Sequence, residues 1–596
     1  MLRITRLTVT GLCIAGLTAA ALTPAAAEPG AEPAAAAPIA VKSAGSANNV
    51  GLSPCNNVPA KLTGYGPGDL IASTELDLSG SPITGARAWR ILYVSIGVDD
   101  RNLEPVCGVV VAPSDPAKVK RNIIGWSHGT MGLNQSCQPS MDPNTYVFGA
   151  TPNGIGAVKY GSAISGGVSG KPEDGILQGL INDGRVVTVT DYYSGLGSGK
   201  GKKQHYALGL PSGANVLDSV RAGIRLVGEL PGSLVGGPGT WDLVTWGHSQ
   251  GGQAELWAGQ LARKYFAGTS PRKAPNPSVN LVGVAALAPA TSLTAPKGMK
   301  LSNKLVGRHL GDFEMHQGAA EAFGGTVGSI GPLLFSLVAK TWDQYGGYKV
   351  NKHAKFVGLP GGARPKVTSI VTTKKSAPSK YNGQRAAGII TSNCLLAGQG
   401  ALTAAKATQP FTNPKKNAFF VQPIWGTKVH GQYVGRFDKT CISTHNSAIK
   451  AWCSWMQFNT PGPNGTNKFD KIPKNQAGQP VGVFIAQGMN DNVIHCISPT
   501  NGQVPTQKNC LSAQYYASMV PKYCPAGGSV GHLEFNTWQM FKGSLVKAGS
   551  PATHMAIPGQ AADNGSGGFA GSKLDTFMNN AFAHTLTNGC TAAVAN

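Results

Sequence analysis

Apolar runs divide the first half of the chain into alternating strands and helices. Residues 88–96 and 106–112 are rich in β-branched and aromatic side chains, and the polar turn at 99–102 joins them into a predicted antiparallel pair. Four further runs predict strands: a buried strand at 122–127, a strand with its carboxyl-end loop at 184–193, a short strand that begins at 241, and a largely apolar strand at 279–287. Residues 212–224 have the helical period. Largely apolar strands separated by helices are typical of a mostly parallel sheet that helices cover on both faces.

The regular pattern ends near residue 288 and returns only at residue 480. Residues 289–479 are expected to form an insertion, either a cap over an active site or a structural subdomain unrelated to substrate. Its apolar helix at 332–338 is a candidate wall of an acyl pocket, although such a stripe is more often core. After a strand at 480–487, the sequence predicts three elements: a helix at 536–548, a last strand at 551–559 and a closing helix at 572–586.

Residues 241–255 combine a short strand, a turn centred on Ser249 and a helix. Gly247, Ser249 and Gly251 have the G-x-S-x-G spacing of a nucleophile elbow. Side chains at the two glycines would collide with neighbouring backbone, so the spacing holds the serine out at the edge of a sheet. Ser249 is therefore predicted as the nucleophile, with the N–H of Gln250 facing an oxyanion. The alternative is a glycine turn with an exposed serine.

A catalytic carboxylate and histidine are expected after the elbow, in the order Ser, Asp, His. Asp491 follows the strand at 480–487 and is the predicted acid, although an aspartate in such a turn also forms Asx-turns. His532, in a glycine loop, is the predicted base, and His554 and His584 are its rivals.

The loop at 128–132 follows the third predicted strand and is the expected source of a second oxyanion donor. The N–H of Thr130 is the candidate, because the glycines around it let the backbone approach a substrate. His128 precedes Ser249 along the chain, which is the wrong order for a base in this arrangement. We expect His128 to order the loop.

The first 27 residues predict secretion. Arg3 and Arg6, an apolar run and three alanines form the pattern of a cleaved signal peptide, and an Ala/Pro-rich leader is expected to continue to residue 50. No later run reaches the roughly 20 apolar residues of a membrane span. Outside the signal, the cysteines form an even set that predicts up to five disulfides, with 496–510 and 441–453 as possible local pairs: 55, 107, 137, 394, 441, 453, 496, 510, 524 and 590.

The net charge of +23 comes from scattered lysines and arginines, without a nucleic-acid-binding motif. It favours attraction to an anionic cell surface or acidic polymer over nucleic acid. The sequence has no C-x-x-C motif or clustered Cys/His spacing, so no metal is expected, and the predicted chemistry needs no organic cofactor.

Together these segments resemble the secretory lipase family of α/β-hydrolases. The similarity lies in residues 126–130 with 137–140, in 191–197, in the elbow and in the Asp491 turn. The resemblance implies an α/β-hydrolase core at 51–288 and 480–596, with the insertion at 289–479 acting as a lid. It also implies a secreted lipase or esterase.

The expected mechanism is hydrolysis of a carboxylic ester through an acyl-enzyme. Ser249 attacks the ester carbonyl, His532 moves the proton and Asp491 orients the imidazole. A secreted peptidase or acyltransferase would share this triad. A non-catalytic cell-surface binding protein would keep the fold without a working base.

Overall fold

The computed structural model places its described residues in one compact unit, which spans Val41–Asn596. The predicted signal peptide, the leader, His532 and most of the predicted insertion lie outside the described residues. No helix within them is both long and apolar enough to cross a membrane. The described residues are 54–133, 135–148, 175–196, 204–229, 234–235, 239–267, 278–294, 330–345, 349, 352–353, 355–360, 394, 427–429, 432–434, 447–489, 491, 493–494, 510–524, 533–538, 554, 557–562, 564 and 568–586.

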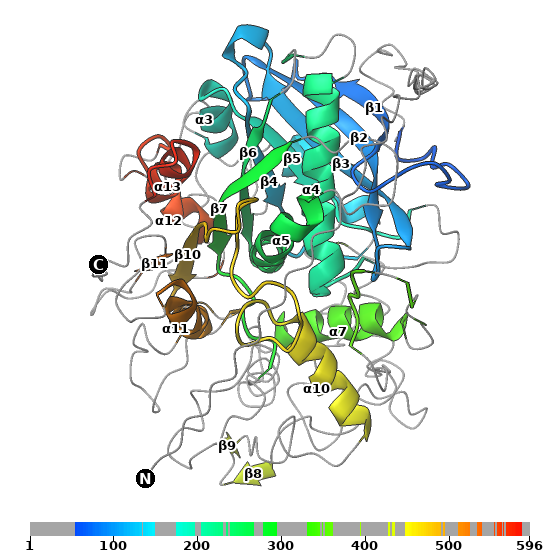
Figure 1. The fold of residues 1–596 in the computed structure, drawn as a ribbon, viewed down its shortest axis with the longest axis vertical. Coiled ribbons are helices and arrows are strands. Elements are labelled where there is room, and N and C mark those ends of the chain that lie inside the picture. The colour runs from blue at the N-terminus through cyan, green and yellow to red at the C-terminus, as the bar shows by residue number, and fades with distance from the viewer. Residues whose placement is uncertain are drawn as a thin grey trace, which may run out of the picture. The chain divides into compact units, whose positions relative to one another are not determined.

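A sheet of nine strands, in the order β1-β2-β3-β5-β4-β6-β7-β10-β11, organises the described residues (Figure 1). The first pairs, up to β3 with β5, are antiparallel, and all later pairs are parallel. The strands are β1 Leu70–Leu76, β2 Ala86–Ile96, β3 Leu103–Pro113, β4 Asn122–Ser127, β5 Val186–Thr190, β6 Trp241–His248, β7 Val279–Leu287, β10 Gly482–Gly488 and β11 Leu533–Trp538. A separate antiparallel pair consists of β8 Thr427–Val429 and β9 Gln432–Val434.

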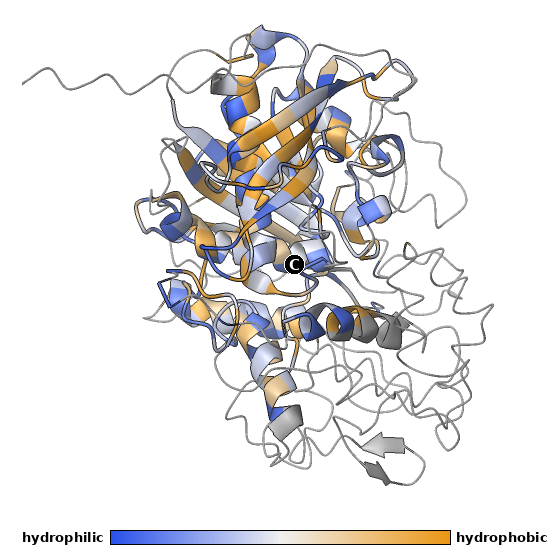
Figure 2. Cartoon of the chain, turned by 90° about the vertical axis from the view of Figure 1, so that its right-hand side faces the viewer, coloured by the Kyte–Doolittle hydropathy of each residue, from blue (hydrophilic) through white to orange (hydrophobic). Residues whose placement is uncertain are grey.

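Helices cover both faces of the sheet because side chains alternate along each strand. In β3, Val110 packs into one core cluster with α4 and α5, while Val109 packs into a second cluster with α3, α12 and α13. Figure 2 shows apolar residues along these strands and helices. The helices are α1 Pro143–Tyr146, α3 Ile176–Asn182, α4 Gly209–Ile224, α5 Gln250–Phe266, α7 Ile330–Asp343, α10 Ser447–Asn459, α11 Leu511–Tyr523, α12 Ile557–Ala561 and α13 Lys573–Phe582. The predicted mostly parallel sheet with two covered faces is confirmed.

The end of the sheet differs from the sequence prediction. The last strand among the described residues is β11, which pairs in parallel with β10 from Leu533 to Trp538. The predicted helix at 536–548 is therefore wrong at its start. The predicted strand at 551–559 is wrong at its end, because α12 begins at Ile557, and residues 551–553, 555 and 556 lie outside the described residues. Pro558, in the first turn of α12, lacks the N–H that a sheet ladder needs and is tolerated at a helix start.

Two described helices of the predicted insertion, α7 and α10, pack against each other through tryptophans. The rings of Trp342 and Trp452 stack with centroids 5.7 Å apart, and Trp455 lies 5.8 Å from Trp342. Trp342 also donates its indole N–H to the carbonyl of Tyr206, at 2.9 Å. This bond joins α7 to the loop that leads into α4.

The carboxyl end of α10 is bonded to the core at Asn459. Its side-chain oxygen accepts the N–H of Gly209 at 2.8 Å. Its carbonyl accepts side-chain N–H groups of Gln253 and Trp257, both at 3.1 Å. Asn459 thus contacts α4 and α5 together.

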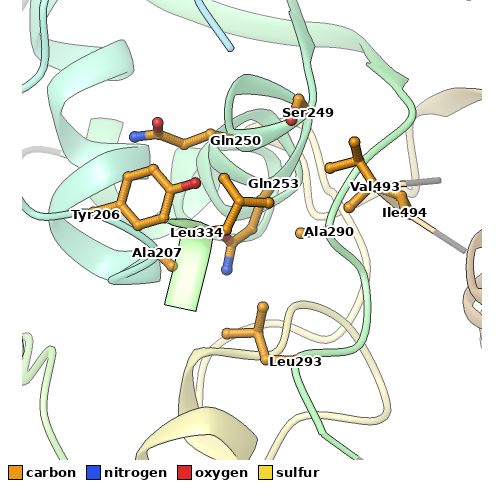
Figure 3. Close-up of a pocket in the computed structure, with 10 residues that line it drawn as sticks. All are labelled: Tyr206, Ala207, Ser249, Gln250, Gln253, Ala290, Leu293, Leu334, Val493 and Ile494. Carbon is orange, nitrogen blue, oxygen red and sulfur yellow. The ribbon is translucent and has the colours of Figure 1, made fainter. Parts of the chain in front are cut away.

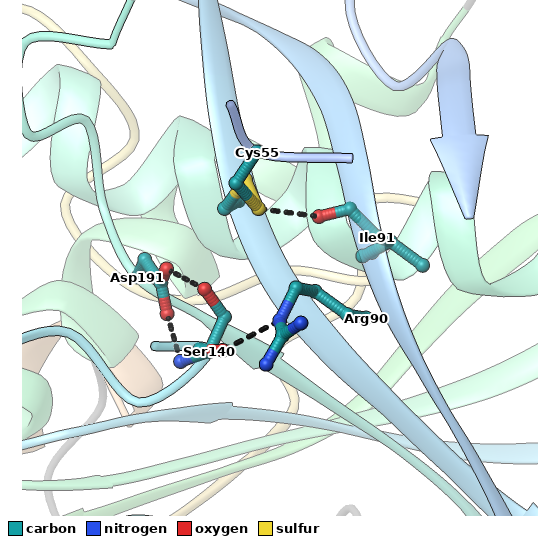
Figure 4. Close-up of a disulfide and its surroundings, with 6 residues drawn as sticks. Cys55, Arg90, Ile91, Ser140 and Asp191 are labelled. Carbon is teal, nitrogen blue, oxygen red and sulfur yellow. Dashed lines mark hydrogen bonds between the residues drawn. A yellow bond between two sulfur atoms is a disulfide. The ribbon is translucent and has the colours of Figure 1, made fainter. Parts of the chain in front are cut away.

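Disulfides join distant parts of the chain, as the cysteine count predicts. Cys55 is bonded to Cys107 in β3 (Figure 4), and Cys137 is bonded to Cys394. Three more described cysteines are disulfide-bonded: Cys453, Cys510 and Cys524. Cys441 and Cys496, which the two suggested local pairs require, lie outside the described residues.

Candidate active site

Ser249 occupies a strained turn between β6 and α5. Its backbone has φ 59° and ψ −118°, a positive φ that non-glycine residues rarely adopt. Such a conformation costs about 1–3 kcal/mol and persists where the surrounding structure enforces it. Here the Ser249 N–H donates to the carbonyl of Leu287 in β7, at 2.8 Å. The serine is therefore fixed at the carboxyl edge of the sheet.

The two glycines of the elbow have no room for side chains. A Cβ at Gly251 would lie 2.0 Å from the carbonyl oxygen of Ser127, and a Cβ at Gly247 would lie 2.7 Å from the carbonyl carbon of Gly251. Both distances are far below any real contact of a Cβ atom. The steric reason for the G-x-S-x-G spacing is thus confirmed, because β6, α5 and the end of β4 meet at this point.

Asp491 is buried in the turn after β10, and both of its carboxylate oxygens are bonded. Oδ1 accepts the N–H groups of Val493 and Ile494, at 2.8 and 2.7 Å. Oδ2 accepts the side-chain N–H of Gln487 at 3.0 Å and Nδ1–H of His554 at 2.8 Å. The Asx-turn expected as an alternative is present, and the same carboxylate also orients an imidazole.

The histidine next to Asp491 is His554, the rival of the predicted His532. His532 lies outside the described residues, and the next residue, Leu533, pairs with Val483 near the start of β10. Asp491 follows the opposite end of β10. His554 follows the last strand, where an α/β-hydrolase carries its base. The sequence prediction puts a strand at 551–559, so that His554 falls inside a strand and not after one.

His584, the other rival, lies away from Asp491. Its Nε2 bonds Asp242 at 2.9 Å, near the start of β6, and its side chain is 57% exposed. Since Ser249 follows the end of β6, the structure separates His584 from the elbow.

His248 contacts His554 directly. Its Nε2–H donates to the His554 carbonyl at 3.0 Å, and the two ring centroids lie 4.6 Å apart. Burial and the neighbouring His554 lower the pKa of His248 well below its ordinary value, so its ring stays neutral.

The loop after β4 lies against the nucleophile. A Cβ at Gly129 would lie 3.6 Å from the Cβ of Ser249, so the backbone of this loop approaches the serine closely. Thr130 Oγ1 bonds the hydroxyl of Tyr206 at 2.7 Å. Tyr192 donates its hydroxyl to the carbonyl of His128 at 3.1 Å. The loop is thus fixed on both sides of Gly129.

His128 is buried within this loop and bonds its backbone. Its Nδ1–H donates to the Gly129 carbonyl at 2.6 Å. Burial lowers the pKa of His128 to about 4, which keeps the ring neutral at neutral pH. These contacts agree with the expected role of His128 in ordering the loop.

Two buried acids support the same edge of the sheet. Glu255, in α5, accepts a hydrogen bond from Ser127 Oγ, and burial raises the pKa of Glu255 well above its ordinary value. Asp191 accepts the N–H of Ser140 at 2.9 Å (Figure 4), and burial raises the pKa of Asp191 to about 6. Among the described residues, no hydrogen bond or ion pair joins either acid to His554.

Sequence reasoning missed the polar residues that support the site. Gln487 and His248 are buried polar side chains next to predicted catalytic residues, and Glu255 is an acid in an otherwise apolar helix face. A buried charged group needs a hydrogen-bond or ion-pair partner, so an acid at a predicted core position indicates a buried polar contact. The sequence spacing does not reveal which residues are the partners of such an acid.

A mostly apolar pocket opens beside Ser249 (Figure 3). The core supplies the serine and the start of α5, the turn after β10 supplies two aliphatic side chains, and α7 supplies Leu334. The described lining residues are Tyr206, Ala207, Ser249, Gln250, Gln253, Ala290, Leu293, Leu334, Val493 and Ile494. The expectation that the apolar helix near 332–338 reaches an active-site pocket therefore agrees with the geometry at Leu334.

The sheet order and the strained elbow between β6 and α5 define an α/β-hydrolase fold. A family model described as secretory lipase matches residues 158–300. The chain's resemblance to the secretory lipases is thus confirmed, and the matched segment includes the elbow.

Two curated relatives are lipases of Candida albicans. Lipase 9 is 25% identical over 252 residues, which cover 41% of this chain and 46% of that protein. Lipase 5 is 25% identical over 250 residues, 41% of this chain and 45% of that protein. The chain thus spans about half the length of these relatives.

Solved structures with a similar fold include lipase A of Candida antarctica in its closed state. It has a TM-score of 0.48 and 15% identity, and the match covers 91% of this chain and 89% of the other. The rice cell wall degrading esterase LipA of Xanthomonas oryzae has a TM-score of 0.44 and 13% identity, over 80% of this chain and 92% of the other.

Proposed function

We propose that this protein hydrolyses carboxylic esters, with Ser249 as nucleophile, His554 as base and Asp491 as acid. The observation that carries the proposal is the 2.8 Å bond between His554 Nδ1 and Asp491, together with the contact of His554 with His248, the residue before the strained Ser249. His554 takes the place of His532 in the sequence-based mechanism. The matched secretory lipase segment supports the same reaction class.

The proposed reaction has two steps. His554 Nε2 removes the proton of Ser249 as the serine attacks the ester carbonyl, and it returns that proton to the leaving alcohol. Water then attacks the acyl-enzyme with the same base. No hydrogen bond joins His554 Nε2 to Ser249 among the described residues, and such bonds are often long before substrate binds.

Backbone N–H groups are proposed to hold the oxyanion. Gln250 is the first residue of α5, so its N–H has no partner within the helix and points from the positive end of the helix dipole. The second donor is proposed in the loop at Gly129 and Thr130, which lies against Ser249. Each such donor is worth about 3 kcal/mol of transition-state stabilisation in acyl hydrolases.

The pocket beside Ser249 is proposed to bind the acyl chain of a lipid or simple ester. Leu293, Leu334, Val493 and Ile494 supply apolar walls without a charged side chain. Leu334 comes from the insertion at 289–479, which we propose covers the active site. A lipase or esterase is therefore favoured over a peptidase, whose substrate carries polar backbone groups.

Secretion is proposed for the same protein. The disulfides Cys55–Cys107 and Cys137–Cys394 support it, since disulfides persist in oxidising compartments. The signal pattern in residues 1–27 is the sequence argument.

The test is hydrolysis of p-nitrophenyl esters from acetate to palmitate by the full-length secreted protein. Ser249→Ala and His554→Ala are expected to lose at least about a thousandfold in kcat, because triad members act as one unit. A fluorophosphonate probe should label the wild type and not Ser249→Ala.

His532→Ala is the matched control, and it should keep wild-type kcat. Loss of activity in His532→Ala, with His554→Ala active, would return the base to His532. A wild type inert to every ester and to the probe would favour the binding-protein alternative.

A further inference from the structure

His248 makes two contacts with His554 that the hydrolytic steps do not use. It lies directly before the nucleophile in β6, yet it bonds the backbone of a residue 306 positions further along the chain. The Nε2 to carbonyl distance is 3.0 Å, and the rings lie 4.6 Å apart at 41°. One side chain thus contacts both the backbone and the ring of the proposed base.

Two described residues make hydrogen bonds or ring contacts with His554. Asp491 bonds its Nδ1, and His248 bonds its carbonyl and faces its ring. The hydrogen bond to Asp491 holds the imidazole of His554, and the bond from His248 holds the backbone of the same residue. His248 thus contacts the part of His554 that the bond to Asp491 does not reach.

We propose that His248 is a positioning residue that holds the backbone and ring of His554 in reach of Ser249. The inference rests on the proposed function, because it requires His554 to be the base. His248 is adjacent to Ser249 in sequence, so the same turn that orients the nucleophile also sets the distance to its base.

The charge state of His248 suits this role. Its ring is buried, and its lowered pKa keeps it neutral. A neutral neighbour does not repel the imidazolium that forms on His554 during the reaction, whereas a second cation at this distance would. Asp491 and His248 are the ionisable groups that contact His554 within the described part of the chain.

Two variants of His248 separate its hydrogen bond from its packing. His248→Phe keeps an aromatic ring and removes the donor. His248→Gln places a side-chain N–H near the position of Nε2. Hydrolysis of p-nitrophenyl butyrate is measured, with active sites counted by fluorophosphonate titration so that unfolded protein does not contribute.

His248→Phe is expected to lose about tenfold to a hundredfold in kcat with KM nearly unchanged, since a displacement near 1 Å has effects of this size. His248→Gln should recover most of the loss. The low-field proton resonance of the N–H that His554 donates to Asp491 should broaden in His248→Phe and return in His248→Gln.

The inference is overturned if His248→Phe keeps wild-type kcat and resonance, or if His248→Gln is as impaired as His248→Phe. If the proposed function itself is wrong, the variants give a different result. In that case His554→Ala remains active whatever residue occupies position 248. An inactive His554→Ala beside a normal His248→Phe would reject the positioning role alone.

Discussion

Replacing Gly251 with alanine tests how tightly the elbow is built. The new Cβ would lie 2.0 Å from the Ser127 carbonyl oxygen, whereas ordinary contacts begin at 3.4 Å. The two backbones must therefore separate by about 1.4 Å, and the neighbouring atoms at 2.7 and 2.9 Å also belong to backbone. Ser127 directly precedes the loop with the second proposed oxyanion donor, so this shift moves that donor away from Ser249.

Two effects of Gly251→Ala on stability have opposite signs. Alanine is a better helix former than glycine by about 1 kcal/mol, which would stabilise α5. Overpacking of a filled site costs about 1–3 kcal/mol, and occasionally more. Because the contact is between backbone atoms, we expect the steric cost to exceed the helix gain, and the free energy of unfolding to fall.

The expected loss in kcat for Gly251→Ala is at least about a hundredfold, from a displacement larger than 1 Å. The assay is p-nitrophenyl butyrate hydrolysis per titrated site, with urea unfolding for stability. Gly80→Ala is the control, since a Cβ there would meet no atom within 4 Å. A Gly251→Ala protein with normal kcat and raised stability would refute the steric argument.

Three further predictions follow. Asp491→Asn should lower kcat by about 10³–10⁴, because the amide favours the wrong tautomer of the base, and a loss below tenfold in titrated kcat would contradict this. Leu334→Trp should lower kcat/KM for the decanoate ester relative to acetate by at least about tenfold, whereas an unchanged ratio would mean that α7 does not contact the acyl chain. The third concerns His128, whose pKa is lowered from 6.5 to about 4 in the folded chain. The unfolded chain therefore binds a proton first, so the free energy of unfolding falls as pH drops from 6.5 to 4, by about 3 kcal/mol. Urea unfolding should show this slope in the wild type relative to His128→Gln. The variant is needed for comparison because the raised pKa values of two buried acids, Asp191 and, in α4, Asp218, make the free energy of unfolding rise as pH drops. A difference in unfolding free energy between wild type and His128→Gln that stays constant from pH 6.5 to 4 would contradict the prediction.

The first half of the fold could be predicted because its signals are local. The predicted strand at 279–287 matches β7 at both ends, and the predicted helix at 212–224 lies within α4. A buried parallel strand is a short apolar run between breaks, and this pattern does not depend on distant contacts. The G-x-S-x-G spacing is equally local, since its reason is contact between residues a few positions apart and one neighbouring strand.

The base could not be assigned from sequence because its environment is assembled from distant segments. Residues 533–538 lie after a glycine-rich stretch and are short enough for either a strand or the start of a helix. These residues form a strand because they pair with β10. That pairing is a tertiary contact, which the local sequence does not reveal. With the last strand predicted at 551–559 and not at 533–538, His554 falls inside a predicted strand instead of after β11.

The active site can stay fixed despite the long insertion, because the carboxyl end of α10, within the insertion, is hydrogen-bonded to the core. Doubling the length of a flexible loop costs only about 0.6 kcal/mol in closure entropy. The three hydrogen bonds that Asn459 accepts from Gly209, Gln253 and Trp257 each contribute about 0.5–1.5 kcal/mol. These bonds together outweigh the cost of added length, and they hold the chain at the helix that begins beside Ser249. The sequence between β7 and α10 is therefore free to vary in length without moving the nucleophile, while α7 still supplies Leu334 to the pocket.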